Sequence, residues 1–387
     1  MSGMRSKTRA GRLFLGVVLA SMTGGVGFAA PAPKSPPGHV IIAYVFPQDG
    51  LIDPAAIDAT KITHVNYAFA NLAQGKVVEG FARDAENFKV LAGLRKKHPH
   101  LKLLVSVGGW TWSKGFSDAA LTAQSRKVFV DSSVAFVRRH DLDGFDVDWE
   151  YPGMVGDGNV FRPEDKENFT ALMAELRAAL DQEGKAMKRH LLLTFAAGAS
   201  SEFLEHTEMG KVQATVDFVN LMTYDFRVAA DQGEAGHHAN LYPNPTDPRQ
   251  SSADRAVREF LAAGVPANKL VLGVPFYGRA WIVAKADARG LYQPGKAPPE
   301  RIQTGYASLA ADRVGKGGFE RHWDGHAQAP YLWNADQKIF ISYEDPESLR
   351  LKCRYIRDHK LAGAMFWEYY SDPSGVLVGT LADQLLK

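Results

Sequence analysis

Residues 143–152 read Asp-Gly-Phe-Asp-Val-Asp-Trp-Glu-Tyr-Pro, and they place acids inside what otherwise has the pattern of a buried strand. Successive side chains of a strand point to opposite faces of its sheet. Asp146, Asp148 and Glu150 therefore share one face. The other face carries the apolar side chains Phe145, Val147 and Trp149. Such strict alternation argues against a solvated acidic surface and indicates a strand whose acids point into a site.

Short apolar runs rich in β-branched residues recur along the chain, and amphipathic segments at 164–180, 252–263 and 347–359 separate several of them. Eight strands alternating with helices favour an α/β fold, a closed (β/α)8 TIM barrel, over an open doubly wound sheet. The eight predicted strands are 40–46, 62–70, 101–107, 144–149, 191–197, 216–223, 270–277 and 362–367.

Enzymes with this barrel build their active sites at the C-terminal ends of the strands. The acidic row would then point towards the barrel mouth and end with Glu150. Neighbouring carboxylates raise one another's pKa, which predicts that Glu150 keeps a proton near neutral pH and can serve as a general acid. Asp143 has the opposite parity and is expected to be a structural partner at the strand entrance. The alternative, a cluster that binds a hard cation, lacks a second group of candidate ligands.

The spacing of the strands is regular except between the seventh and the eighth. Residues 282–341 form an extra segment, and its end, 331–343, alternates as a hairpin does. We predict a small inserted α+β domain there, with the barrel formed by residues 38–281 and 342–387.

The N-terminus has the pattern of a secretory signal. Basic residues precede an apolar run at 13–22, and small residues follow to Ala30. We therefore predict a signal peptide at 1–30, a proline-rich linker at 31–37, and a secreted protein, extracellular or periplasmic. The single cysteine, Cys353, lies in a helical pattern and is expected to be a core residue.

The charge balance narrows the class of partner. The chain carries 45 basic and 43 acidic residues among 387, with no basic block that would attract nucleic acid. We expect no nucleic-acid partner, no membrane partner and a monomer.

Several segments together resemble one family. Residues 143–150, DGFDVDWE, resemble the DxxDxDxE signature of glycoside hydrolase family 18, the chitinases. Residues 106–109 resemble its SxGG element and residues 222–225 its MxYD element. The stretch 275–281, with the insertion after it, resembles the subgroup with a chitinase insertion domain. The resemblance runs from about residue 38 onwards; Ala43 is a small departure, since the first strand of the family often has glycine before the tyrosine.

This resemblance implies a retaining mechanism in which the substrate's own acetamido group is the nucleophile. Glu150 would protonate the glycosidic oxygen, Asp148 would hold the acetamido group, and Asp146 would share a proton with Asp148. Tyr224 would donate a hydrogen bond to the acetamido oxygen, and Asp225 would hold the distorted sugar. No cofactor and no metal ion is implied.

Aromatic residues at or near strand ends are candidates to stack on sugar rings. Trp110 directly follows the third strand, and Trp367 ends the eighth, where the family places a tryptophan under the sugar. Phe46 fits the core and a groove equally well, and His237 and His238 are expected to be loop or subsite residues. The predicted substrate-binding residues are Trp110, Trp367, Tyr44, Phe69, Met222, Tyr151, Tyr277, Arg279 and Glu368.

The favoured prediction is a secreted hydrolase of chitin or chitooligosaccharides. A peptidoglycan or N-glycan hydrolase would use the same mechanism on another substrate. A non-catalytic chitin-binding lectin is the alternative from another class, but such proteins typically lose the acid, and Glu150 is intact here.

Overall fold

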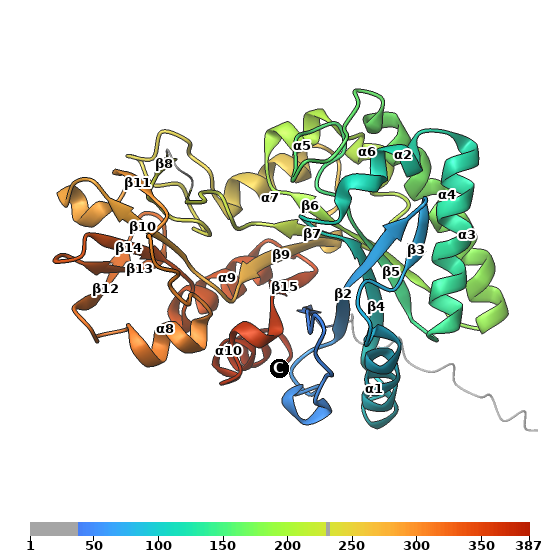
Figure 1. Ribbon diagram of the computed structural model, residues 1–387, viewed down its shortest axis with the longest axis horizontal. Coiled ribbons are helices and arrows are strands. Elements are labelled where there is room, and N and C mark those ends of the chain that lie inside the picture. The colour runs from blue at the N-terminus through green and yellow to red at the C-terminus, as the bar shows by residue number, and fades with distance from the viewer. Residues whose placement is uncertain (1–37, 230–232) are drawn as a thin grey trace, which may run out of the picture. The chain divides into compact units, whose positions relative to one another are not determined.

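The computed structural model describes residues 38–229 and 233–387 (Figure 1). The predicted signal peptide and linker, 1–30 and 31–37, lie outside the described residues. Among those described, no helix has the length and apolarity needed to cross a membrane.

Eight parallel strands close into a barrel, which confirms the predicted TIM-barrel fold. Each strand pairs in parallel with its neighbours, and β1 pairs with both β15 and β2, so the sheet closes on itself. A short hairpin strand, β3 (Lys76–Val78), extends β2 outside the ring. The barrel strands are β1 (Val40–Val45), β2 (His64–Ala73), β4 (Lys102–Gly108), β5 (Gly144–Asp148), β6 (Leu192–Gly198), β7 (Phe218–Met222), β9 (Leu270–Pro275) and β15 (Gly363–Trp367).

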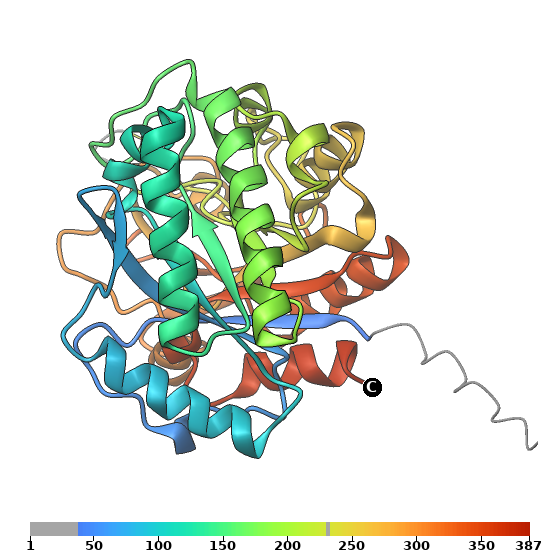
Figure 2. The same ribbon diagram turned by 90° about the vertical axis from the view of Figure 1, so that its right-hand side faces the viewer.

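Helices cover the outside of the barrel, and Figure 2 shows α3 and α4 side by side over the strands. The predicted helical segments at 164–180, 252–263 and 347–359 correspond to α4, α7 and α9. The helices are α1 (Asp84–Lys97), α2 (Phe116–Ala120), α3 (Ala123–Arg139), α4 (Asp165–Met187), α5 (Ser201–Glu205), α6 (Met209–Val212), α7 (Ala253–Ala262), α8 (Tyr306–Asp312), α9 (Pro346–Asp358) and α10 (Val376–Leu385).

The apolar periodicity of these helices explains the main core. On α4, Phe169, Leu172 and Leu176 recur at helical spacing and are buried against the barrel. The outward face of β5, with Phe145, Val147 and Trp149, belongs to the same layer. Cys353 is also buried in this layer, as predicted.

A six-stranded antiparallel sheet forms the insertion, and five of its strands lie between β9 and β15 in the chain. At the place of the alternating stretch 331–343, β13 and β14 pair as a hairpin. Two strands depart from the predicted segment 282–341. β10 begins three residues before it, at Arg279, and β8, from the connection between β7 and β9, lies wholly outside it and pairs with β11. The inserted strands are β10 (Arg279–Val283), β11 (Pro294–Lys296), β12 (Phe319–Asp324), β13 (Ala329–Asn334) and β14 (Ile339–Ser342), and β8 is Gly233–Glu234.

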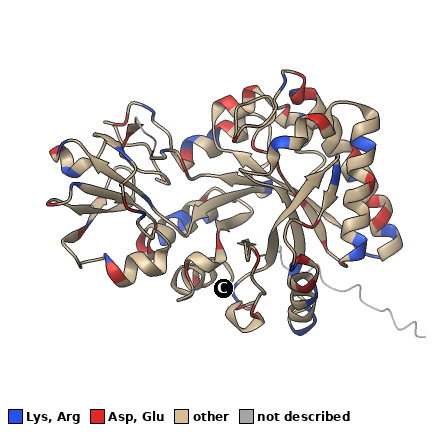
Figure 3. Cartoon of the chain, viewed as in Figure 1, with Lys and Arg blue, Asp and Glu red and all other residues tan. Residues whose placement is uncertain are grey.

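Charged residues of both signs are interspersed along the outer helices (Figure 3). This distribution agrees with the near balance of 45 basic and 43 acidic residues. The acids of β5 are different, because they are buried inside the barrel.

Candidate active site

A groove of about 1240 Å³ lies at the C-terminal ends of the barrel strands. Its walls come from the barrel loops on one side and from the insertion, around Gln303 and Ser308, on the other. Most of the predicted site residues line it. They are Tyr44, Phe69, Trp110, Asp148, Glu150, Tyr151, Met222, Tyr224, Asp225, Tyr277, Arg279 and Trp367.

Asp146 lies beneath this groove and is fully buried. Its carboxylate accepts hydrogen bonds from four other barrel strands: β1, β4, β6 and β7. Burial raises the pKa of Asp146, and these hydrogen bonds oppose the rise. The four donors are the Tyr44 hydroxyl (2.9 Å), the Ser106 hydroxyl (2.7 Å), the Thr194 hydroxyl and the Asn220 amide (3.2 Å).

The backbone at the end of β4 closely approaches the backbone at the end of β5. Gly109 N–H donates to the Asp148 carbonyl at 2.8 Å. A Cβ on Gly108, whose φ is +109°, would lie only 2.2 Å from that carbonyl oxygen, so no side chain fits there. The Ser113 hydroxyl also donates to the Asp148 carbonyl and accepts from Glu150 N–H. The backbone that presents Asp148 and Glu150 is therefore fixed by β4 and the loop after it.

Asp148 and Glu150 both resist ionisation. Burial raises the pKa of Asp148 well above its usual range, and the charges of Glu150 and Asp146 add to the effect. Burial also raises the pKa of Glu150, to about 7, with the Tyr151 hydrogen bond opposing and the charge of Asp225 reinforcing the rise. The predicted proton on Glu150 is thus supported, but burial is a larger cause than the like-charged row on which the prediction relied.

The proton sharing expected between Asp146 and Asp148 stays a prediction. Asp146 is occupied by its four donors, and Asp148 Oδ1 is buried without a partner among the described residues. Asp148 lines the groove, so a polar group of a substrate can supply the hydrogen bond that Oδ1 lacks.

Tyr224 and Asp225 follow β7 and face the same groove. Arg279, at the start of β10, donates Nε–H to Asp225 Oδ1 (2.7 Å) and Nη2–H to Oδ2 (2.6 Å). Burial alone would raise the pKa of Asp225, but the hydrogen bonds of His238 and Arg279 hold it well below its usual range. Asp225 is therefore an anion that faces two carboxyl groups which tend to keep their protons.

Aromatic rings form one end of the groove. Trp367 stacks on Phe69 with their ring centres 5.3 Å apart, and Phe46 lies 5.5 Å from Trp367. Phe46, which the sequence assigned equally to core and groove, lines the groove. Trp110 is 51% exposed, which is unusual for so large an apolar side chain and suits a ring that a sugar can cover.

The sequence reasoning missed two members of this aromatic wall. Phe81 and Trp112 also line the groove, with ring centres 4.9 Å apart. Trp112 stands two residues after Trp110, so the same cluster of rings after β4 could have indicated it. Phe81 stands in the connection between β3 and α1, where no periodic pattern marks it.

Glu368 does not line the groove. Its carboxylate accepts from Tyr370 N–H (3.0 Å) and from the Ser371 hydroxyl (2.9 Å), and so it caps the short 3-10 helix Tyr369–Ser371. In the part of the chain that the structure describes, no group of three or more His, Cys, Asp or Glu residues could hold a metal ion.

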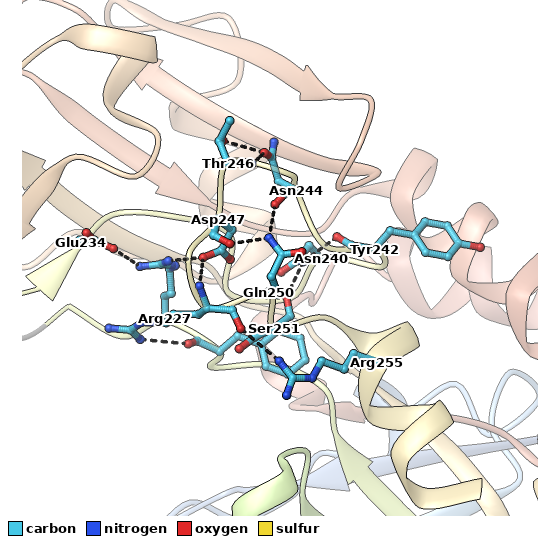
Figure 4. Close-up of polar contacts among 12 residues, drawn as sticks. Arg227, Glu234, Asn240, Tyr242, Asn244, Thr246, Asp247, Gln250, Ser251 and Arg255 are labelled. Carbon is cyan, nitrogen blue, oxygen red and sulfur yellow. Dashed lines mark hydrogen bonds and ion pairs between the residues drawn. The ribbon is translucent and has the colours of Figure 1, made fainter. Parts of the chain in front are cut away.

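The loop between β7 and α7 joins the barrel to the insertion, and Figure 4 shows the polar contacts that hold it. The buried Arg227 pairs with Asp247 (2.5 Å) and with Glu234 of β8 (2.9 Å). Asn240 donates to the Ser251 carbonyl at 2.8 Å, and Ser251 lines the groove. These contacts hold Arg227, which is two residues after Asp225, and Ser251, which lines the groove.

Comparison with known proteins agrees with this geometry. The model of the family described as glycosyl hydrolases family 18 matches residues 40–372. Chitinase A1 of Niallia circulans is 40% identical over 390 residues, covering 86% of this chain and 56% of that protein. The chain thus spans a little over half the length of that relative. Chitotriosidase-1 of Mus musculus is 34% identical over 324 residues, covering 81% of this chain and 68% of that protein.

Solved structures share the fold. A family 18 N-acetylglucosaminidase from Paenibacillus barengoltzii superposes with a TM-score of 0.82 at 40% identity, covering 90% of this chain and 100% of the other. Chitinase ChiA74 from Bacillus thuringiensis gives a TM-score of 0.82 at 36% identity, covering 90% of this chain and 70% of the other.

Proposed function

Because the chain belongs to glycoside hydrolase family 18, we propose that it is a chitinase that cleaves the β-1,4 linkages between N-acetylglucosamine units. The observation that carries this proposal is Glu150, a carboxyl group at the floor of the groove whose pKa is raised to about 7. A general acid needs its proton at the working pH, and a pKa near 7 meets that need.

The mechanism that we propose proceeds without an enzyme nucleophile. Glu150 gives its proton to the glycosidic oxygen as the bond to C1 breaks, and the carbonyl oxygen of the 2-acetamido group attacks C1 from the other face. The intermediate is an oxazolinium ion. Glu150, now a carboxylate, then takes a proton from water as that water attacks C1. The bond between C1 and the acetamido oxygen breaks, the acetamido group is restored, and the anomeric configuration is retained.

Asp148 and Tyr224 would orient the acetamido group. The open Oδ1 of Asp148 can accept its N–H, and the Tyr224 hydroxyl can donate to its carbonyl oxygen. Because these two hydrogen bonds orient the acetamido oxygen towards C1, less entropy is lost when the reaction begins. Asp225 would bind the distorted sugar, and the rings of Trp110 and Trp367 would stack on sugar faces.

Hydrolysis of N-acetylglucosamine hexamer tests the proposal, with products followed by mass spectrometry and proton NMR. We expect fragments of two or more units with a new β-anomeric end. In Glu150→Gln, the loss of the general acid should slow cleavage about 10²–10⁴-fold. Glu86→Gln, on the surface of α1, is the matched control and should cleave as the wild type does.

The products also separate the alternatives. Release of single N-acetylglucosamine units would assign instead the activity named for the Paenibacillus barengoltzii relative. Binding of the hexamer without cleavage would indicate a lectin. Cleavage of peptidoglycan or N-glycans, but not of the hexamer, would assign one of those glycans as the substrate instead of chitin. We further propose export through the pattern at 1–30, which N-terminal sequencing of the protein from culture medium and periplasm would test.

A further inference from the structure

His238 is a fully buried histidine directly behind Asp225, and the mechanism above gives it no role. Its Nδ1 lies 3.3 Å from Asp225 Oδ1. Arg279 binds both oxygens of the same carboxylate. Asp225 is therefore held by two side chains from different segments, one from the insertion strand β10 and one from the loop after β7.

The backbone of His238 is fixed on both sides. Its N–H donates to the Ser342 hydroxyl of β14 at 3.0 Å. Its carbonyl accepts from Phe226 N–H at 3.1 Å. The imidazole also packs against Tyr277, with ring centres 5.4 Å apart. The position of Nδ1 relative to Asp225 is thus set by the barrel loop and by the insertion together.

The surroundings of the ring favour its neutral form, with the proton on Nδ1. Burial lowers the pKa of His238, and the charges of Arg279 and Lys352 lower it further, while Asp225 opposes them. Lys352 is itself paired with Glu344. A carboxylate can only accept, so the hydrogen in the Asp225 contact belongs to Nδ1. Nε2 is buried without a partner among the described residues, and so nothing competes for that hydrogen.

We propose that His238 is a positioning residue that acts through Asp225: its Nδ1–H, with the fork of Arg279, fixes the plane of that carboxylate and keeps it ionised beside the sugar. This inference rests on the proposed function, in which Asp225 holds the distorted sugar. Without His238, one oxygen of Asp225 loses a donor, and the carboxylate can rotate and take up a proton more readily.

His238→Leu removes the donor, whereas His238→Asn keeps an amide N–H near the position of Nδ1. In His238→Leu we expect kcat to fall about 10-fold with a smaller change in KM, because the carboxylate that holds the distorted sugar is less well oriented. In His238→Asn we expect most of the wild-type kcat. His238→Gln is a more conservative test of the same loss, because its amide reaches the place of Nε2 and leaves Asp225 without the donor.

His237→Leu is the matched control. His237 is an equally buried neighbour, but it pairs with Asp324 of β12 at 3.0 Å rather than with Asp225. It should lower the melting temperature and leave kcat near the wild-type value. A purely structural role for His238 would give the same pattern in both histidine variants, and that result would overturn the inference.

A second measurement does not depend on turnover. Carbon-13 NMR of the aspartate carboxyl groups, with Asp225→Asn to assign the signal, reports the surroundings of the Asp225 carboxylate in the free protein at neutral pH. Its chemical shift should change in His238→Leu and in His238→Gln, which remove the donor, but much less in His238→Asn. An unchanged chemical shift in His238→Leu would refute the role of His238. Absence of hydrolysis by the wild type would instead refute the proposed function, and the chemical shift would still decide the role of His238.

Discussion

Replacing Glu150 by glutamine should stabilise the protein at alkaline pH, and the gain should vanish in acid. The folded pKa of Glu150 is about 7, against 4.5 for the free side chain. A carboxyl group whose pKa is raised by folding holds its proton more tightly in the folded state. Its contribution to stability is therefore full below pH 4.5 and is lost as pH rises towards 7. Glutamine has nearly the same shape and no ionisable proton, so its contribution to stability does not change over this range.

The size of the effect follows from the pKa difference. A shift of about 2.5 units, each worth about 1.4 kcal/mol, sets an upper limit of about 3.5 kcal/mol above pH 8. Asp148 adds to the effect with the same sign, since its pKa is raised by burial and then by the charge of Glu150. Loss of that charge makes Asp148 easier to ionise.

Urea unfolding of wild type and Glu150→Gln from pH 4 to pH 9, followed by circular dichroism, measures the difference directly. We expect little difference at pH 4, a rise between pH 5 and pH 7, and a plateau above pH 8. Glu86→Gln on the exposed surface controls for the loss of one negative charge. A difference between wild type and Glu150→Gln that does not change with pH would show that burial does not hold the proton on Glu150.

Two further predictions concern the same groove. Tyr151→Phe removes a hydrogen bond that lowers the pKa of Glu150, so the alkaline limb of the kcat/KM profile should move up by about one pH unit. Asp225→Asn removes a negative charge that raises this pKa, so the alkaline limb should move down. The pH–rate profiles of both variants measure this, and limbs that move the same way would contradict the stated causes. Gly108→Ala forces a Cβ against the Asp148 carbonyl and should lower both the melting temperature and kcat. Gly93→Ala on α1, where nothing lies within 4 Å, should cost no stability, and equal melting temperatures for the two variants would contradict the close approach.

Much of the fold could be predicted from local patterns. The eight barrel strands are each a short apolar run, and the parity of β5 separates Asp146 and Asp148 from Phe145 and Val147 without any knowledge of the fold. The inserted sheet interrupts a regular spacing and is visible for that reason. The strand β8 was not predicted, because two residues are too few to show the alternation of apolar and polar side chains that marks a strand. Only their pairing with β11 makes them a strand.

The candidate site was predicted less completely. Phe81 and Trp112 come from loops, and loops have no period that tells which ring faces a groove. Glu368 was placed among the substrate contacts by its position after Trp367, but its carboxylate turns away to cap a short helix.

Local sequence patterns were enough to select Asp146, Asp148 and Glu150, because strand alternation and the end of a barrel strand are local properties. Asp225 was selected by the resemblance of residues 222–225 to a family element. How those groups ionise is a property of the folded chain. The proton on Glu150 depends on burial by distant segments, and the charge of Asp225 depends on Arg279 and His238, which are 54 and 13 residues away along the chain. Desolvation and charge act through space, and folding alone sets those distances.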